Sequence, residues 1–207
     1  MSVLSDEEIK TRLTKPLSDI RSMRITPLLD DKLDHDAIDV HLGSYFRVPA
    51  ISSVECVRPY LKGTVPHYPE LIHKPYKRDI KRVTEGSEAV ENKADENTLI
   101  LQPQHAVLAS TLEYIKMPGD ISAQILTKSS WARIFVSIAS APWIHPFYRG
   151  CLTLEITNLG NVAVALPVGK SIAHIVFMKL EGEIVSHEDI IEGSYAGAIM
   201  PEAPVFK

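Results

Sequence analysis

Cysteine and basic charge are both scarce in this sequence. Its 207 residues include only two cysteines, Cys56 and Cys151, which stand far apart in the chain. A disulfide framework and a Cys-x-x-Cys metal site are therefore excluded within one chain, and we expect both thiols to be reduced. Lys and Arg number 22 against 26 Asp and Glu, which gives a formal charge of −4. This balance provides no broad basic field for a nucleic-acid backbone, so polymeric DNA or RNA is not an expected partner.

Long apolar runs are also missing, and the first residues do not have the pattern of a secretory signal. The longest nearly uncharged apolar stretches, 134–144 and 162–168, are shorter than the roughly 20 residues that span a bilayer. The first residues, MSVLSDEE, are acidic and lack the basic and apolar regions of a secretory signal. These features predict a cytoplasmic protein with no membrane partner.

The composition is that of an ordinary globular protein. The chain is 45% hydrophobic and 23% charged, and its length predicts a single domain over residues 1–207. Ser5 and Glu8 have the spacing of a capping box, in which Ser5 accepts from the amide of Glu8 and the Glu8 side chain returns to the amide of Ser5. This pattern predicts a short helix over about 6–13.

From Leu99 onward, short β-branched runs separated by proline and glycine recur about every eight to twelve residues, which predicts an all-β sandwich or barrel. An earlier apolar alternation predicts a strand over 38–42 that ends at Gly43. The other predicted strands cover 106–111, 121–127, 135–138, 151–158, 162–166 and 171–180.

The segment at about 53–97 differs from the rest in its charge. A basic cluster from Lys74 to Arg82 is followed by an acidic run from Glu85 to Glu96. We interpret the segment as a charged insertion on the β core, a solvated hairpin or loop whose halves attract each other. Contact of the basic cluster with phosphate groups is the alternative.

A polar motif directly follows the predicted strand 121–127. Residues 128–133, Lys-Ser-Ser-Trp-Ala-Arg, place two hydroxyls and two cations close together. Hydroxyl donors and positive charge are what a polyphosphate requires. A polar turn with a short capped helix explains the same residues equally well.

Glu155 is the second residue that suggests chemistry. It lies in the predicted strand 151–158, on the opposite face from Leu152, Leu154 and Ile156. A carboxylate inside an apolar barrel is costly unless it is paired or used, so Glu155 is a candidate general base. On a solvent-exposed face it is only a surface residue.

Five segments carry a resemblance to known proteins. They are 37–43 (AIDVHLG), 128–133 (KSSWAR), 143–155 (WIHPFYRGCLTLE), 4–9 and 167–174. In order and spacing they resemble the dCTP deaminase branch of the dUTPase superfamily. The resemblance implies a mostly β fold, a distorted β-barrel or jelly roll of the dUTPase-like (β-clip) type with a short N-terminal helix. It also implies a nucleotide substrate and a homotrimer with active sites shared between subunits.

Roles for individual residues come from the resemblance. Glu155 is implied to activate a water that attacks C4 of cytosine, with Ser129 near that water and the backbone carbonyl of Ala141 orienting it. Arg133 is implied to bind the phosphates, and Mg²⁺ to arrive bound to the triphosphate. The other implied nucleotide contacts are Lys128, Ser130, Trp143, His145, Thr153, Leu154, His174, His187 and Tyr195. No zinc is expected, because the His-x-Glu and Pro-Cys-x-x-Cys motifs of zinc deaminases are missing.

Histidines stand at three positions where the family has other polar residues. His145 replaces an aspartate, His174 a glutamine and His187 a tyrosine, and Ser194 and Ala198 also depart from the family pattern. Loss of the aspartate argues against dUTP hydrolysis. The imidazoles are expected to contact phosphate or sugar, or to pack, and a transition-metal site made of all three is the other interpretation.

Together these observations predict metal-independent hydrolytic deamination of a deoxycytidine nucleotide. The substrate is dCTP or a close analogue, the products are the uracil nucleotide and ammonia, and Glu155 is the general base. A dUTPase, or a bifunctional deaminase and diphosphatase, is the second hypothesis. A nucleotide-binding regulator that keeps the fold without turnover is the third, because several implied substrate ligands have changed.

Overall fold

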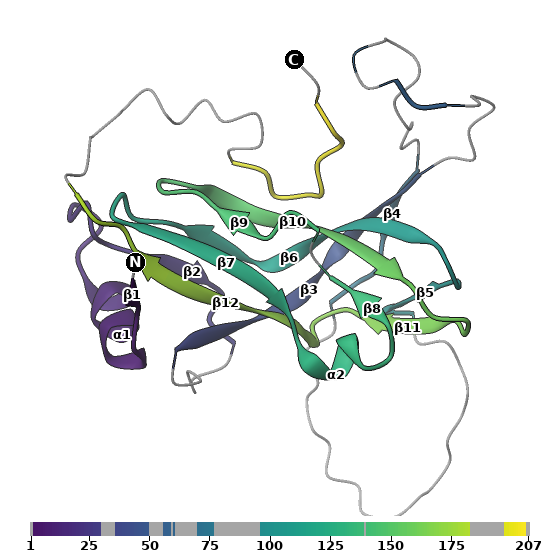
Figure 1. Cartoon of the computed structure of the whole chain (residues 1–207), viewed down its shortest axis with the longest axis horizontal. Helices are drawn as coiled ribbons and strands as arrows, with labels where there is room; N and C mark the ends of the chain where they lie inside the picture. Colours follow the sequence, from purple (N-terminus) through teal and green to yellow (C-terminus); the bar gives the residue numbers. More distant parts are fainter. Residues whose placement is uncertain are drawn as a thin grey trace, which may run out of the picture.

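A computed structural model describes residues 2–29, 36–49, 56–58, 60, 70–76, 96–138, 140–182 and 197–205. Strands dominate these ranges, and only two helices occur in them (Figure 1). In chain order the elements are β1 (Ser2–Val3), α1 (Asp6–Thr14), β2 (Arg24–Thr26), β3 (Ala37–Val48), β4 (Glu70–His73), β5 (Thr98–Leu101), β6 (Ala106–Lys116), β7 (Ile121–Thr127), α2 (Ser129–Ala132), β8 (Val136–Ser137), β9 (Trp143–Ile144), β10 (Arg149–Asn158), β11 (Val164–Pro167) and β12 (Ser171–Lys179). The expected mostly β fold with a short N-terminal helix is confirmed.

The strands of the described ranges form one large antiparallel sheet and one small one. The large sheet has the order β8-β10-β6-β3-β12-β7-β9, with β1 added to β12, β2 to β6 and β4 to β3. The small sheet pairs β11 with β5. Neighbours in the large sheet are far apart in sequence, as where β12 lies between β3 and β7. The two segments that hold the candidate functional residues are therefore attached to different strands of the large sheet. The 128–133 motif follows β7, whereas Glu155 lies in β10.

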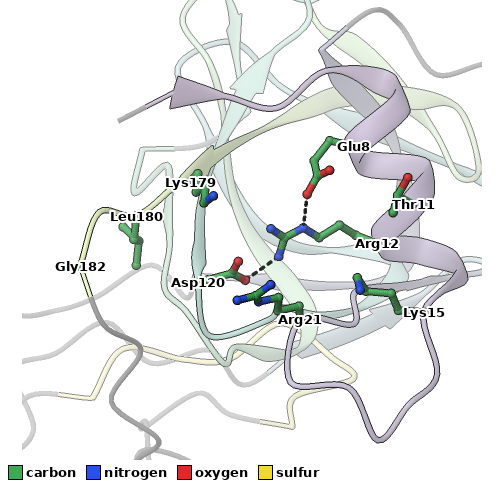
Figure 2. A pocket seen from close by; sticks show the side chains of 9 residues that line it. All are labelled: Glu8, Thr11, Arg12, Lys15, Arg21, Asp120, Lys179, Leu180 and Gly182. Carbon is green, nitrogen blue, oxygen red and sulfur yellow. Dashed lines mark hydrogen bonds and ion pairs between the residues drawn. The ribbon is translucent and has the colours of Figure 1, made fainter.

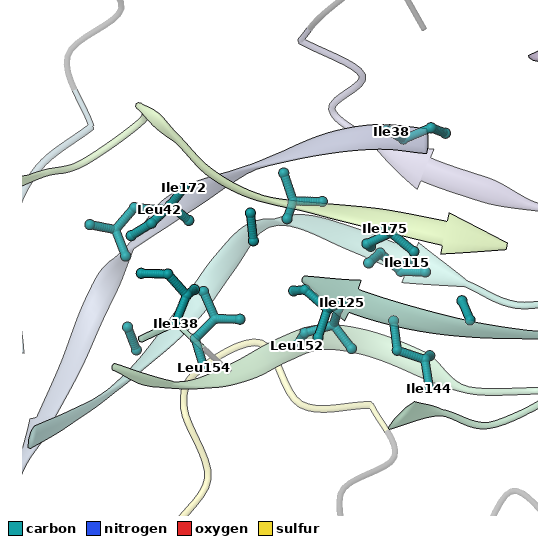
Figure 3. Close-up of a cluster of buried hydrophobic side chains, with 14 of the residues drawn as sticks. Ile38, Leu42, Ile115, Ile125, Ile138, Ile144, Leu152, Leu154, Ile172 and Ile175 are labelled. Atoms are coloured by element: carbon teal, nitrogen blue, oxygen red, sulfur yellow. The ribbon is translucent and has the colours of Figure 1, made fainter. Parts of the chain in front are cut away.

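Alternating apolar side chains of the strands meet in a single core (Figure 3). Phe46 of β3 and Phe177 of β12 have no exposed surface, and Leu154 and Ile156 of β10 are likewise fully buried. Burying each such side chain contributes roughly 1.5–3 kcal/mol to folding. The inward face of β10 thus holds the strand in place, while its outward face is available for polar residues.

The prediction that the strand over 38–42 ends at Gly43 is wrong. β3 continues to Val48, and its register with β6 shifts between Leu42 and Phe46. A Cβ at position 43 would lie 2.7 Å from the backbone oxygen of Ser110. Gly43 is therefore needed because β6 approaches closely at this irregularity, and not because the strand stops there.

Only half of the predicted capping box forms at α1. Ser5 caps the helix and its hydroxyl accepts from the amide of Glu8 at 3.4 Å. The Glu8 carboxylate does not return to the amide of Ser5. It accepts instead from Nε of Arg12 at 2.8 Å, one turn further along the helix. Glu8 therefore supports the buried Arg12 rather than the helix start.

Most of the predicted charged insertion at 53–97 lies outside the described residues. One part of it is seen, because β4 (Glu70–His73) pairs with β3 from Tyr45 to Val48. In the described ranges, no helix is long and apolar enough to cross a membrane.

Candidate functional site

Glu155 lies in a pocket on the outward face of β10. Leu154 and Ile156 point into the core, and Glu155 between them is half-buried on the other side. Strand alternation places Glu155 on the face opposite Leu154 and Ile156, as the sequence predicts, and the side chain is neither fully enclosed nor fully exposed there. The pocket has a volume of about 440 Å³. We call it the glutamate pocket, and it is lined by Leu108, Ala141, Trp143, Tyr148, Leu152, Thr153, Glu155, Glu202 and Pro204.

Two backbone amides orient the carboxylate of Glu155. Oε2 accepts from the N–H of Ser140 at 3.1 Å and from that of Ala141 at 3.3 Å. Oε1 accepts no hydrogen bond from the described residues. One oxygen is thus held by the β8–β9 connection, and the other is available to a water or a ligand. Ala141 contributes its amide here, whereas the resemblance implied a role for its carbonyl.

The C-terminal segment 197–205 closes one side of the glutamate pocket. Cys151 donates its amide to the carbonyl of Ala198 at 2.7 Å, and Glu202 donates its amide to Thr153 Oγ1 at 3.1 Å. Gly150 has a φ of +145°, and a Cβ there would lie 2.9 Å from the carbonyl oxygen of Ala198. A glycine is therefore required where this segment crosses β10.

The side chains of Tyr148 and Cys151 pack beside this segment. The Tyr148 hydroxyl donates to the carbonyl of Cys151 at 2.8 Å. Burial raises the pKa of Tyr148 well above its usual value, and burial, with the nearby Glu113 carboxylate, raises the pKa of the Cys151 thiol to about 11. Both groups are held neutral, which makes them structural rather than reactive.

We expect the two cysteines to differ strongly in reactivity. At pH 8, about one in a thousand Cys151 side chains is a thiolate, and the residue is buried, whereas Cys56 is exposed. Alkylation with iodoacetamide followed by peptide mass mapping should label Cys56 at least about 100-fold faster. Both thiols should react alike in guanidinium chloride. Equal rates in the native protein would show that the packing around Cys151 is not as described.

The 128–133 motif forms a short helix at the end of β7. We call Lys128, Ser129, Ser130 and Arg133 the α2 motif. Lys128 is ion-paired with Asp39 of β3, which also accepts from the Ser171 hydroxyl at 2.9 Å. The side chains of Ser129, Ser130 and Arg133 are exposed and make no side-chain hydrogen bond with the described residues. Arg133 is therefore the cation of the α2 motif that is available to an anion.

One chain does not bring the α2 motif to Glu155. None of its four residues lines the glutamate pocket. Figure 1 shows α2 on the opposite side of the sheet from the C-terminal segment that borders this pocket. The predicted site residues therefore form two separate groups, one around Glu155 with Ala141, Trp143 and Thr153, and one on α2.

The histidines do not form a cluster in the described residues. His145 is exposed between β9 and β10, whereas His174 lies in β12, directly opposite Asp39 of β3. His187 and Tyr195 lie outside the described residues. The described residues contain no group of three or more His, Cys, Asp or Glu side chains that could hold a metal ion. Leu154 is fully buried in the core and has no exposed surface that could contact a nucleotide in this chain.

The pocket contains residues that sequence reasoning did not assign to it. Tyr148 lies inside a motif that carried the resemblance, but nothing in the sequence marks it as part of the pocket floor. Glu202 is the more important omission, because it is a second carboxylate in the lining. It lies 47 positions from Glu155 along the chain, and no spacing rule links the C-terminal segment to β10.

Comparisons with known proteins agree with the resemblance. The family profile described as dCTP deaminase-like matches residues 3–180. A Nanoarchaeum equitans protein named dCTP deaminase, dUMP-forming, is 35% identical over 179 residues, covering 86% of this chain and 84% of that protein. A Natronomonas pharaonis protein named dCTP deaminase is 30% identical over 205 residues, covering 97% and 93%.

A solved structure shares the fold. It is the 2′-deoxycytidine 5′-triphosphate deaminase from Agrobacterium tumefaciens, with a TM-score of 0.57 and 18% sequence identity. The match covers 86% of this chain and 48% of that one, so this chain spans about half of its length. At this identity the likeness bears on the fold alone, and it agrees with the curled β-sheet seen here.

Proposed function

This chain belongs to the dCTP deaminase-like family, and we propose that it hydrolyses the 4-amino group of a deoxycytidine nucleotide. The substrate is dCTP or a close analogue, and the products are the uracil nucleotide and ammonia. The observation that carries the proposal is Glu155, held by two backbone amides through Oε2 and free at Oε1 in a pocket of about 440 Å³. A pocket of this size accommodates a nucleoside.

Glu155 acts as the general base in this proposal. Its carboxylate takes a proton from a water while the water oxygen bonds to C4 of the cytosine ring. Protons then pass to the ring nitrogen N3 and to the amino group, the C4–N bond breaks, and ammonia leaves as the C4 carbonyl forms. The amides of Ser140 and Ala141 fix the carboxylate, so little reorganisation is needed when the proton moves.

The α2 motif supplies the phosphate contacts, and it does so from a neighbouring subunit. Arg133 is exposed and lacks a carboxylate partner among the described residues, so its guanidinium is available for phosphate oxygens. Because it lies away from the glutamate pocket of its own chain, a closed ring of identical subunits would combine one chain's Glu155 with the next chain's α2. We propose a homotrimer with shared sites on this basis.

The proposed chemistry needs no resident metal ion. Water activation runs through Glu155, and Mg²⁺ enters bound to the triphosphate as part of the substrate. Chelator-treated protein that still releases ammonia from magnesium dCTP, and in which elemental analysis finds no bound transition metal, would support this part of the proposal. Near-stoichiometric zinc or iron that is needed for turnover would overturn it.

The nature of the product is the second point to decide. Relatives named dUMP-forming favour release of pyrophosphate together with deamination, whereas His145 stands where the family has an aspartate and argues against it. Incubation with a panel of deoxy- and ribonucleotides plus magnesium, with ammonia and pyrophosphate measured separately, tests both activities. Ammonia alone indicates a dCTP deaminase, and both products indicate the dUMP-forming reaction. Tight nucleotide binding with neither product would show a regulator.

Replacing Arg133 with alanine should weaken nucleotide binding. The variant loses charge-assisted hydrogen bonds to phosphate, so the Kd for dCTP should rise about tenfold to a hundredfold. Calorimetric titration measures the change, and Lys10→Ala, which removes an exposed cation from α1, is the matched control. An unchanged Kd in Arg133→Ala would place the phosphates elsewhere.

A further inference from the structure

A second cavity, separate from the site described above, lies between α1, the turn that follows it, and the end of β12 (Figure 2). We call it the α1 cleft. Its volume is about 450 Å³, and its lining includes the basic residues Arg12, Lys15, Arg21 and Lys179 and the acidic residues Glu8 and Asp120. It shares no lining residue with the glutamate pocket or with the α2 motif.

Both carboxylates of the cleft are already used by one buried guanidinium. Arg12 donates from Nη1 to Asp120 at 2.6 Å and from Nε to Glu8 at 2.8 Å. Its side chain is only 4% exposed and that of Asp120 only 8%. Burial opposes the charge on Arg12, but the hydrogen bonds to Asp120 and Glu8 outweigh it and raise the pKa of the guanidinium. The floor of the cleft is thus a fixed ion-pair network of one guanidinium and two carboxylates, which together carry a net negative charge.

The remaining cations around the cleft are incompletely neutralised. Lys15 is ion-paired with Asp19, which lies outside the lining. The Arg21 guanidinium and the Lys179 ammonium make no ion pair or hydrogen bond within the described part of the chain, although the Arg21 amide donates to Asp19 Oδ1 at 2.8 Å and the Arg21 charge acts on that carboxylate. They come from separate segments, the turn after α1 and the end of β12, and Figure 2 shows both beside Asp120 at the cleft. Because the four cations of the lining outnumber its two carboxylates, the α1 cleft as a whole is positively charged and favours an anion with more than one negative charge.

We propose that the α1 cleft binds a phosphate polyanion, inorganic pyrophosphate or the phosphates of a nucleotide, through Arg21 and Lys179. The guanidinium of Arg21 offers paired N–H donors that match two phosphate oxygens, and the Lys179 ammonium adds a point charge. The Arg12 network holds α1 against the β6–β7 turn, and phosphate bound between Arg21 and Lys179 would link the turn after α1 to the end of β12. The proposal does not depend on Glu155 or on deamination.

Titration of the full chain with sodium pyrophosphate in a calorimeter tests the proposal. In the double variant Arg21→Ala/Lys179→Ala the Kd should rise at least about tenfold, because two charge-assisted contacts are lost. It should stay near the wild-type value in the charge-matched double Lys10→Ala/Arg149→Ala. The substituted side chains are exposed, so folding should be preserved, and circular dichroism checks this.

Two results would overturn the proposal. One is an unchanged Kd in the cleft double. The other is an equal rise of the Kd in both doubles, which indicates a response to net charge only. If the proposal holds, a parallel titration with ADP identifies the source of the phosphate. Tighter binding of ADP than of pyrophosphate assigns the cleft to nucleotides, and the reverse assigns it to the inorganic ion.

Discussion

Glu155→Gln is expected to lower the rate of ammonia release from dCTP by about 10²- to 10⁴-fold, the usual contribution of a general base. Glutamine keeps the shape of the side chain but cannot take a proton from water. Nucleotide affinity and assembly should change little, because the proposed phosphate contacts lie on α2. Single-turnover assays of ammonia release, together with calorimetric binding of dCTP, separate the chemical step from binding.

The second carboxylate of the glutamate pocket provides a matched control for this prediction. Glu202 is exposed and lies on the C-terminal segment, where only its backbone amide makes a hydrogen bond, to Thr153. Glu202→Gln should lower the rate less than about tenfold, because it is not held by backbone donors as Glu155 is. A large loss in Glu202→Gln with full activity in Glu155→Gln would move the base to the C-terminal segment.

Asp120→Ala is expected to destabilise the fold by about 3 kcal/mol, which lowers the Tm of a domain of this size by roughly 6–12 °C. The variant leaves the buried guanidinium of Arg12 without its principal partner, and arginine cannot lose its charge to relieve this. The cost stays at the lower end of the range for broken buried pairs because Glu8 still accepts from Nε. Calorimetric melting measures the shift.

The exposed pair on the same helix should behave differently. Lys10 and Asp6 are 58% and 40% exposed, so Lys10→Ala should cost less than about 1 kcal/mol. A similar loss in both variants would show that burial of Arg12 and Asp120 adds nothing to the ion pair. A negligible loss in Asp120→Ala would mean that α1 is held by its apolar contacts, such as Ile9, alone.

Local sequence signals predicted the elements that have clear chemical boundaries. β7 covers the predicted 121–127, because Pro118 and Gly119 precede it and a polar motif follows. The short helix at α1 was found through its Ser5 cap. β3 was cut short at Gly43, because the sequence cannot distinguish a glycine that ends a strand from one that admits a close neighbour.

The sequence predicts which residues belong to the candidate site, but it does not predict how they are placed relative to one another. The alternation of the strand predicts that Glu155 faces away from Leu154 and Ile156, but it does not predict whether that face is enclosed or exposed to solvent. That the α2 motif lies away from Glu155 depends on the sheet order, in which β12 separates β7 from β3 and β6 separates β3 from β10. Long-range pairing of this kind has no local signature. The contribution of the C-terminal segment to the pocket depends on contacts of the same kind.

Mixing of two impaired variants, one in catalysis and one in nucleotide binding, tests most directly whether Glu155 and the α2 motif work together across subunits. Glu155→Gln and Arg133→Ala chains with different tags are co-expressed, and assemblies that carry both tags are purified and assayed with dCTP well below the KM of the Arg133 variant. In every mixed form of the proposed trimer, one boundary joins an intact Glu155 to an intact Arg133, so about one third of the wild-type activity should return. No return of ammonia release in mixed trimers of confirmed composition would contradict the account.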